Sequence, residues 1–216
     1  MNLINYLKEK KTITIFSEKG DKLKISSLMK LIETNKKIFN NMNVNKSDTI
    51  AIVLDNGTKF ITSFLSVISS CIAAPLNPNY SEREFEFYYS DLKPKALITD
   101  MGEDHPSIII AKKRKVKLLS LKKKLFVNAS RVASKNKKKR NTITVNDIAL
   151  ILHTSGTTSR PKMVALSHGN LLHSCKNITE SLKINSKDKN IILMPSFHIH
   201  GIVASILAPL YVGGKI

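Results

Sequence analysis

The sequence predicts an α/β fold, a layered arrangement of helices on a largely parallel sheet, in a chain of 216 residues. Short apolar runs typical of buried strands, such as TIAIVL (49–54) and IALILH (148–153), alternate with segments whose apolar residues recur at helical spacing. Strands that alternate with helices favour crossover connections between parallel strands. A hydrophobic content of 42% fits a soluble globular protein with a sizeable core.

The first elements are a hairpin and an amphipathic helix. TITIF (12–16) and KLKI (22–25) flank the turn sequence EKGD, which predicts two short paired strands. In the next segment Leu28, Ile32 and Phe39 recur near a helical period, and Ser26 or Ser27 is a candidate N-cap. The strand at 49–54 then ends at Asp55, Asn56 and Gly57.

The middle of the chain continues the alternation. A helix is predicted from about Lys59 to Ser70, followed by a strand, IAAPL (72–76). Ser81 and Glu84 form an S-x-x-E capping box at the head of another helix. KALIT (95–99) is a strand, and PSIIIAKKRKVKLLSL (106–121) could hold a helix and a strand.

The last part of the chain predicts four more elements. They are a strand MVALS (163–167), a helix HGNLLHSCKNITESLKI (168–184), a strand NIILMP (190–195) and a helix HGIVASILAPLY (200–211) that ends at Gly213-Gly214.

The net charge of +19 is concentrated in one variable segment. Residues 112–140 hold 11 Lys and 3 Arg without an acidic residue, which leaves +5 for the rest of the chain. A run of cations can hold phosphates electrostatically, but this one contains only Phe126 for stacking, so we expect weak, sequence-independent binding at most.

The compartment is predicted from the cysteines and the apolar runs. Cys71 and Cys175 lie far apart, which is no disulfide framework and suits a reducing compartment. The start of the chain lacks an apolar core of signal-peptide length, and ITSFLSVISSCIAAPL (61–76) is too short to span a membrane. We therefore expect a soluble, cytoplasmic protein.

The stretch HTSGTTSRPK (153–162) has the composition of a phosphate-binding loop. Its hydroxyls and backbone N–H groups could donate to phosphate oxygens, Gly156 permits a sharp turn, and Lys162 offers a mobile point charge. It is not a Walker loop, because no glycine precedes Lys162 and no Ser or Thr follows it. An exposed Ser/Thr turn is the alternative that the spacing leaves open.

Three stretches in order resemble the acyl-adenylate-forming enzymes, the superfamily of acyl-CoA synthetases and adenylation domains. TSGTTSRPKMVALSHGN is similar to their TSGTTGxPKG loop and the strand and helix after it. APLNPNYSEREFEFYYSDLKPKALI and MPSFHIHGIVASILAPLYVGG resemble two further family segments. The resemblance spans roughly 48–216. Ser159 and Met163 replace family glycines, and Met163 could crowd the loop. HTSGTTSRPK and FHIHG are closest to oxalate–CoA ligase-like members.

The resemblance implies ATP with Mg²⁺ as the activating nucleotide, CoA as co-substrate and a small carboxylic acid as substrate. His198 and His200 would line the acid site, and no catalytic residue or metal ligand is assigned. The residues that would cradle the ATP phosphates are Thr154, Ser155, Gly156, Thr157, Thr158 and Lys162.

The family's later motifs, including its magnesium-binding glutamate and mobile lysine, have no counterpart in this sequence. Residues 1–216 are thus expected to be a partial AMP-binding domain, inactive alone, without the domain's C-terminal part and the small mobile domain. A separately encoded C-terminal half could supply both. A peroxisomal location, which related eukaryotic enzymes can have, stays open, although no such signal is visible here.

Other interpretations remain open at this stage. His198 and His200, two apart, would share a face of a strand and could hold a metal, or they could cap a helix. The chain could belong to a fatty-acyl or 4-coumarate-type ligase or an adenylation domain, or be a basic nucleic-acid-binding protein on an inactive ligase half. We interpret His153, His168 and His173 as structural, and both cysteines as buried thiols.

Overall fold

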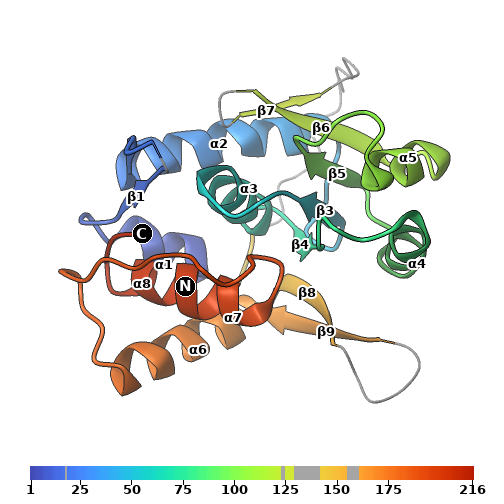
Figure 1. Cartoon of the computed structure of the whole chain (residues 1–216). Coiled ribbons are helices and arrows are strands. Elements are labelled where there is room, and N and C mark those ends of the chain that lie inside the picture. The colour runs from blue at the N-terminus through green and yellow to red at the C-terminus, as the bar shows by residue number, and fades with distance from the viewer. Residues whose placement is uncertain (18, 123–124, 129–141, 155–160) are drawn as a thin grey trace.

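The computed structural model describes residues 1–17, 19–122, 125–128, 142–154 and 161–216, with only the backbone described at 122 and 125–128. These residues form a seven-stranded sheet, a separate two-stranded hairpin and helices on both faces of the sheet (Figure 1). The segment from 129 to 141, which contains six of the fourteen cations of the basic run, lies outside the described residues.

The sheet confirms the predicted fold class. Its strands lie in the order β7-β6-β5-β3-β4-β8-β9. The pairs from β6 to β8 are parallel, whereas β7 and β9 pair antiparallel at the two edges. Their bounds are β3 (Thr49–Val53), β4 (Ile72–Pro75), β5 (Ala96–Thr99), β6 (Lys117–Lys122), β7 (Leu125–Asn128), β8 (Ile148–Thr154) and β9 (Lys162–Ser167).

After Thr49, every residue of the central strand β3 is apolar, because both faces of the strand are covered. Successive side chains of a strand point to opposite faces. Ile50 and Ile52 pack into one hydrophobic cluster, and Ala51 and Val53 pack into another on the opposite side. A strand buried on both faces reads as a continuous apolar run rather than an alternating one, which is the pattern of TIAIVL.

Two helices cover one face of the sheet, α4 (Glu82–Leu92) and α5 (Pro106–Lys113) (Figure 1). The capping box of α4 is formed as predicted, since the Ser81 hydroxyl accepts the Glu84 N–H and the Glu84 carboxylate accepts the Ser81 N–H. Phe85 and Tyr89 are fully buried beneath this helix.

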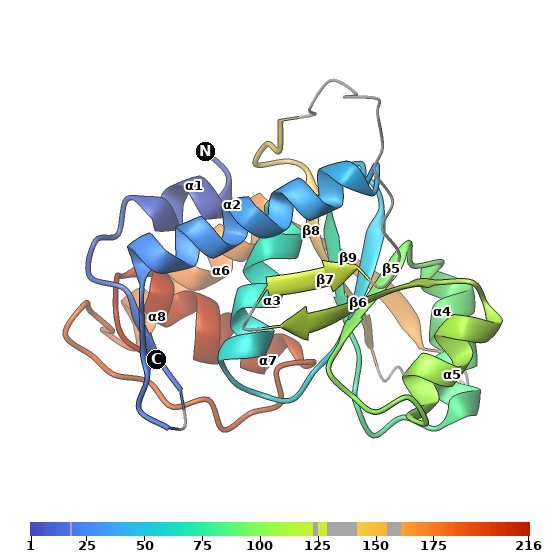
Figure 2. The ribbon, with the colours of Figure 1, turned by 90° about the horizontal axis from the view of Figure 1, so that it is seen from above.

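The other face is covered by α2 (Ile25–Asn41) and α3 (Thr58–Ile68), with α1 (Leu3–Lys8), α6 (His168–Ser181) and the last helices of the chain beside them. Helix α2 packs against α3 and reaches β7 (Figure 2). The predicted cap at Ser26 or Ser27 is wrong, because the N-cap of α2 is Lys24 and makes no side-chain cap bond. The chain enters α2 directly from the hairpin, where Ile25 N–H donates to the Ile13 carbonyl.

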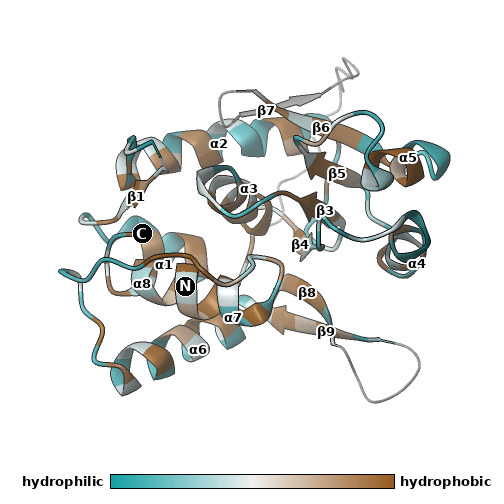
Figure 3. Cartoon of the chain, in the orientation of Figure 1, coloured by the Kyte–Doolittle hydropathy of each residue, from teal (hydrophilic) through white to brown (hydrophobic). Residues whose placement is uncertain are grey.

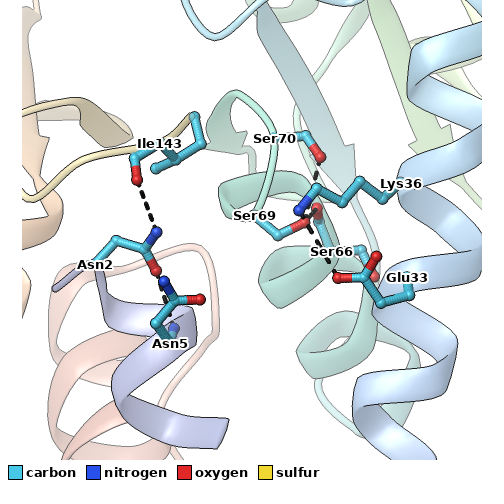
Figure 4. A network of polar contacts seen from close by, with 8 residues as sticks. All are labelled: Asn2, Asn5, Glu33, Lys36, Ser66, Ser69, Ser70 and Ile143. Atoms are coloured by element: carbon cyan, nitrogen blue, oxygen red, sulfur yellow. Dashed lines mark hydrogen bonds and ion pairs between the residues drawn. The ribbon is translucent and has the colours of Figure 1, made fainter. Parts of the chain in front are cut away.

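The predicted hairpin is present as β1 (Thr14–Phe16) paired antiparallel with β2 (Lys22–Lys24). Polar contacts tie the outer elements together (Figure 4). Asn2, the N-cap of α1, donates from Nδ2 to the Ile143 carbonyl at 2.8 Å. At the end of α3, the hydroxyl of its C-cap residue Ser69 donates to the Ser66 carbonyl at 2.6 Å.

The C-terminal helix is one continuous coil in three parts, α7 (Ile199–Ile202), a π-helical turn η1 (Val203–Leu207) and α8 (Ala208–Tyr211). It ends as predicted at Gly213, whose φ of 80° belongs to the left-handed region that favours glycine. Its buried side chains join the same hydrophobic cluster as α2 and α3.

The strand predicted at 190–195 is wrong. These residues form no strand, and Lys189 makes only an isolated bridge to Lys215. No described strand runs beside NIILMP, and a strand exists only where a neighbour accepts and donates its backbone hydrogen bonds. Ile191 is 74% exposed and Leu193 is 82% exposed, while Ile192 packs against the core.

The apolar stretch 61–76 folds into most of α3 and all of β4. None of the helices in the described part of the chain is both long and apolar enough to cross a membrane. Cys71 and Cys175 are free, buried thiols, as predicted. Burial raises the pKa of Cys175 to about 12 and also raises that of Cys71, so both remain protonated at neutral pH.

Candidate functional site

The hydroxyl-rich loop is carried by the hairpin of β8 and β9. Thr154, the last residue of β8, pairs with Lys162, the first residue of β9. The Thr154 hydroxyl donates to the Lys162 carbonyl at 3.4 Å. Ser155, Gly156, Thr157 and Thr158 lie outside the described residues, so the structure places the two ends of the loop and says nothing of its middle.

The loop begins at the carboxyl edge of the parallel sheet. Ile50 of β3, Ala73 of β4 and Leu150 of β8 share one level of the sheet, and the three strands run in the same direction. In open α/β sheets, ligands bind outside the carboxyl ends of the strands. The stretch HTSGTTSRPK therefore leaves β8 at the edge where this architecture places its binding sites.

Lys162 is exposed and, within the described part of the chain, pairs with no carboxylate. Its ammonium is therefore available to an anionic ligand at the base of the loop. Met163, which replaces a family glycine, lies opposite His153 in the ladder, and its side chain is half exposed. Met163 projects to the surface and does not enter the hydrophobic core.

His153 anchors the end of β8 to helix α4. Its Nε2 lies 2.8 Å from Asp91 Oδ2, and its side chain is only 4% exposed. The imidazole also meets the Tyr88 ring edge-on, with 4.8 Å between ring centroids. The structural role predicted for His153 is confirmed, and it fixes the strand from which Thr154 emerges.

His198 and His200 lie at the start of α7 and both are exposed. His198 is the N-cap residue, with its ring against Phe197 at a centroid distance of 4.5 Å. Its side chain makes no cap hydrogen bond, so the interpretation of a capping imidazole is wrong for His198.

The metal interpretation of this pair relied on the two histidines sharing a face of a strand. The structure instead places them where a helix begins, and residues two apart do not face each other on a helix. No group of three His, Cys, Asp or Glu side chains capable of holding a metal gathers anywhere among the described residues.

His168 is a buried histidine at the first position of α6. It is fully buried, and neither ring nitrogen makes a hydrogen bond of regular geometry among the described residues. Burial lowers its pKa to about 4, and the nearby Asp147 carboxylate and the Ile68 backbone oppose that shift only in part. His168 is therefore neutral at physiological pH and belongs to the core, as predicted. His173 is exposed on the same helix, so no structural role is evident for it.

Comparison with known proteins agrees with these features. The family model for AMP-binding enzymes matches residues 10–216. The oxalate–CoA ligase of Saccharomyces cerevisiae is 35% identical over 204 residues, which cover 79% of this chain and 37% of the yeast protein. The oxalate–CoA ligase of Arabidopsis thaliana is 36% identical over 189 residues, covering 83% of this chain and 36% of the plant protein.

The fold is also found in solved structures. Apo MatB from Rhodopseudomonas palustris superposes with a TM-score of 0.83 at 23% identity, and the match covers 100% of this chain and 44% of MatB. The chain thus spans little more than a third of the length of the two oxalate–CoA ligases and less than half of MatB.

Proposed function

Because this chain belongs to the family of AMP-binding enzymes, we propose that it supplies the ATP-phosphate loop and part of the acid site of an acid–CoA ligase that works through an acyl-adenylate. The observation that carries the proposal is the β8–β9 hairpin. It holds Thr154 opposite Lys162 and starts the loop at the carboxyl edge of a parallel sheet.

The proposed reaction has two steps. A carboxylate oxygen attacks the α-phosphorus of ATP, the bond to pyrophosphate breaks, and an acyl-adenylate forms. The thiol of CoA then attacks the acyl carbon, AMP leaves with the bonding electrons, and the thiol proton passes to solvent. Charge neutralisation and positioning dominate phosphoryl-type transfer, which is the role we assign to the loop from Thr154 to Lys162.

Lys162 would neutralise charge on the β- and γ-phosphates, and the hydroxyls and backbone N–H groups of residues 154–158 would hold their oxygens. The family's use of Mg²⁺ is a further part of the proposal. The described residues gather no group of side chains that could hold this ion, so its ligands would belong to another part of the complete enzyme.

We propose oxalate as the preferred acid, with His198 and His200 beside it. Two relatives more than a third identical to this chain are named oxalate–CoA ligases. Exposed imidazoles can donate N–H bonds to a small dianion, and protonation would strengthen them. A cytoplasmic location belongs to the same proposal, in keeping with the two unpaired thiols.

The proposal includes a second polypeptide portion that completes the site, either joined to this one or encoded separately. The relatives extend well beyond the matched residues. Ile191, Leu193 and Met194 expose apolar side chains that further protein could cover. Residues 1–216 would then form part of one AMP-binding domain, whose remainder and small mobile domain lie in that second portion.

The described part of the basic segment does not favour nucleic-acid binding. The first cations of the basic segment are matched by acids, since Lys112 pairs with Glu103, and Lys113 and Arg114 pair with Glu86. Cations held in ion pairs are less available to a phosphate backbone.

The test joins this chain to the C-terminal part of the yeast oxalate–CoA ligase and measures AMP release with oxalate, malonate, coumarate and palmitate. We expect the fastest turnover with oxalate, and faster turnover with palmitate would contradict the choice of acid. Lys162→Ala should lower turnover about 100-fold through loss of phosphate neutralisation. Lys187→Ala, which removes another exposed lysine, is the matched control.

Residues 1–216 alone should show no ATP–pyrophosphate exchange with any of these acids. Exchange above background that Lys162→Ala abolishes would show that the second portion is dispensable.

A further inference from the structure

The turn that carries His198 is held by a residue far away in the sequence, Asn56. Its Nδ2 donates to the Met194 carbonyl at 3.1 Å, and its Oδ1 accepts the Ser196 N–H at 2.8 Å. These bonds bind two backbone groups two residues apart, as a neighbouring strand would. Asn56 thus supplies hydrogen-bond partners to the backbone at the end of the 190–195 segment, which no described strand provides.

The chemistry of the clamp requires an amide. A planar side-chain amide offers one carbonyl acceptor and an NH₂ donor, whereas a carboxylate offers acceptors only. Asn56 lies three residues after the end of β3 and just before Gly57, the N-cap of α3, whose φ of 133° is rare for residues with a side chain. The amide is therefore fixed at the carboxyl end of a central strand.

The remainder of the turn is equally well determined. His198 N–H donates to the Pro195 carbonyl at 3.1 Å, and Ile202 N–H donates to the His198 carbonyl at 3.0 Å. Gly201 allows the Pro195 carbonyl to lie against the helix, because a Cβ at this position would overlap it. Ser196 is buried, but the imidazoles of His198 and His200 are exposed.

The clamp also relates this turn to the hydroxyl-rich loop. β3 and β8 are separated only by β4, and all three are parallel. With neighbouring strands about 4.8 Å apart, the carboxyl ends of β3 and β8 lie roughly 10 Å from each other. Asn56 therefore holds the histidine-bearing turn at the same edge of the sheet from which Thr154 leads into the loop.

We infer that Asn56 is a positioning residue of the acid site, which holds the Pro195–His198 turn so that His198 and His200 are presented at the carboxyl edge of the sheet, where β8 ends at Thr154. The inference rests on the proposed function for the identity of the ligand. The clamp itself rests only on the two hydrogen bonds.

Hydrogen exchange of the full 216-residue chain tests the clamp directly. In Asn56→Ala we expect the Ser196 amide to exchange about tenfold faster, since the acceptor of its N–H is lost. In Asn56→Asp the carboxylate still accepts this N–H but faces the Met194 carbonyl, so the acceleration should be smaller. Asn79→Ala, at an exposed asparagine outside the clamp, is the matched control.

An NMR titration of the histidine ring protons separates positioning from general stability. Asn56→Ala should shift the His198 resonances and leave those of exposed His173 on α6 unchanged. Exchange at Ser196 that stays at the native rate in Asn56→Ala, or that rises equally in Asn79→Ala, would overturn the inference. If Asn56→Ala does not fold, a native rate of exchange at Met194–His198 and native His198 resonances in folded Asn56→Asp would overturn it.

The joined enzyme gives the functional readout. Asn56→Ala should raise the KM for oxalate several-fold and leave the KM for ATP unchanged, and equal changes in both would count against an acid-specific role. A joined enzyme that is inactive with Asn56 in place would contradict the proposed function, while the exchange result would still decide the clamp.

Discussion

Strand β3 and residues 190–195 are both apolar runs, but the side chains of β3 are buried whereas half of those in 190–195 are exposed. β3 pairs with β4 on one side and β5 on the other, and Ile50 and Ile52 are completely buried. In 190–195 the extended chain has no paired strand among the described residues, and Leu193 is 82% exposed. Apolar side chains are therefore buried only where neighbouring strands and helices provide partners on both faces.

The same contrast extends to the edge strand β9. Among the described residues, β9 pairs with β8 alone, and it is largely hydrophobic although Met163 and Val164 are exposed (Figure 3). Exposed apolar surface thus gathers in the last third of the chain, whereas the region around β3 is enclosed. Surfaces of this kind mark places where further protein packs.

The largest expected effect on the free energy of unfolding comes from replacing an isoleucine by alanine, once in β3 and once in residues 190–195. Ile52→Ala should lower the free energy of unfolding by about 3 kcal/mol, because it leaves a cavity in the hydrophobic cluster between the sheet and helices α2 and α3. Ile191→Ala removes the same atoms from a side chain that is 74% exposed and should change it by less than about 0.5 kcal/mol. Urea unfolding measures both, and equal losses would refute the contrast in burial.

The next effect tests a polar group inside the enclosed region. His168 has a folded pKa of about 4, below its unfolded value of 6.5, so folding favours the neutral ring. Its contribution is complete above pH 6.5 and is lost as the pH falls from 6.5 to 4, by about 3 kcal/mol in total.

His168→Leu should flatten this pH dependence in urea unfolding. His173→Leu, at an exposed position of the same helix, should leave it as steep as in the native chain. A native pH profile in His168→Leu would show that another group causes the acid loss.

A smaller effect is expected where the enclosed region meets solvent. Lys46 donates to Asp147 at 2.7 Å, and this bond, aided by the Thr144 N–H, lowers the Asp147 pKa to about 2. The contribution is present above the unfolded pKa of 3.8 and is lost as the pH falls toward 2.

Lys46→Met should cost about 1 kcal/mol or less at neutral pH in urea unfolding, because the pair is partly exposed. Lys176→Met removes the exposed pair with Glu180, in which the charged atoms are 3.8 Å apart, and should cost less. A larger loss in Lys176→Met would reverse the expected order.

The smallest effect on stability is expected at the exposed segment itself. Leu193→Ser should leave the free energy of unfolding within about 0.5 kcal/mol of the native value while reducing self-association of the chain. Sedimentation velocity measures the association. Leu182→Ser, at a leucine that is 67% exposed at the end of α6, is the control. A reduction as large in Leu182→Ser would mean that no particular surface drives association.

Local signals in the sequence predicted most elements correctly where they agree with their surroundings. Ser81 and Glu84 cap α4 because both partners lie within one turn of each other. Ser26 and Ser27 carry the same local preference but do not cap α2, since the hairpin contact between Ile25 and Ile13 already starts that helix. Tertiary contacts decide between equally good local candidates.

The sequence by itself determined the α/β class, the burial of β3 on both of its faces, and the position of HTSGTTSRPK at the end of a strand. These features follow from periodicity and turn residues, which are local properties of the chain. Only the tertiary structure decided that 190–195 is not a strand and that His198 begins a helix. It alone brought Asn56 to Met194 and Ser196. Those outcomes depend on contacts between residues far apart in the chain, and no local pattern encodes which backbone groups will find a partner.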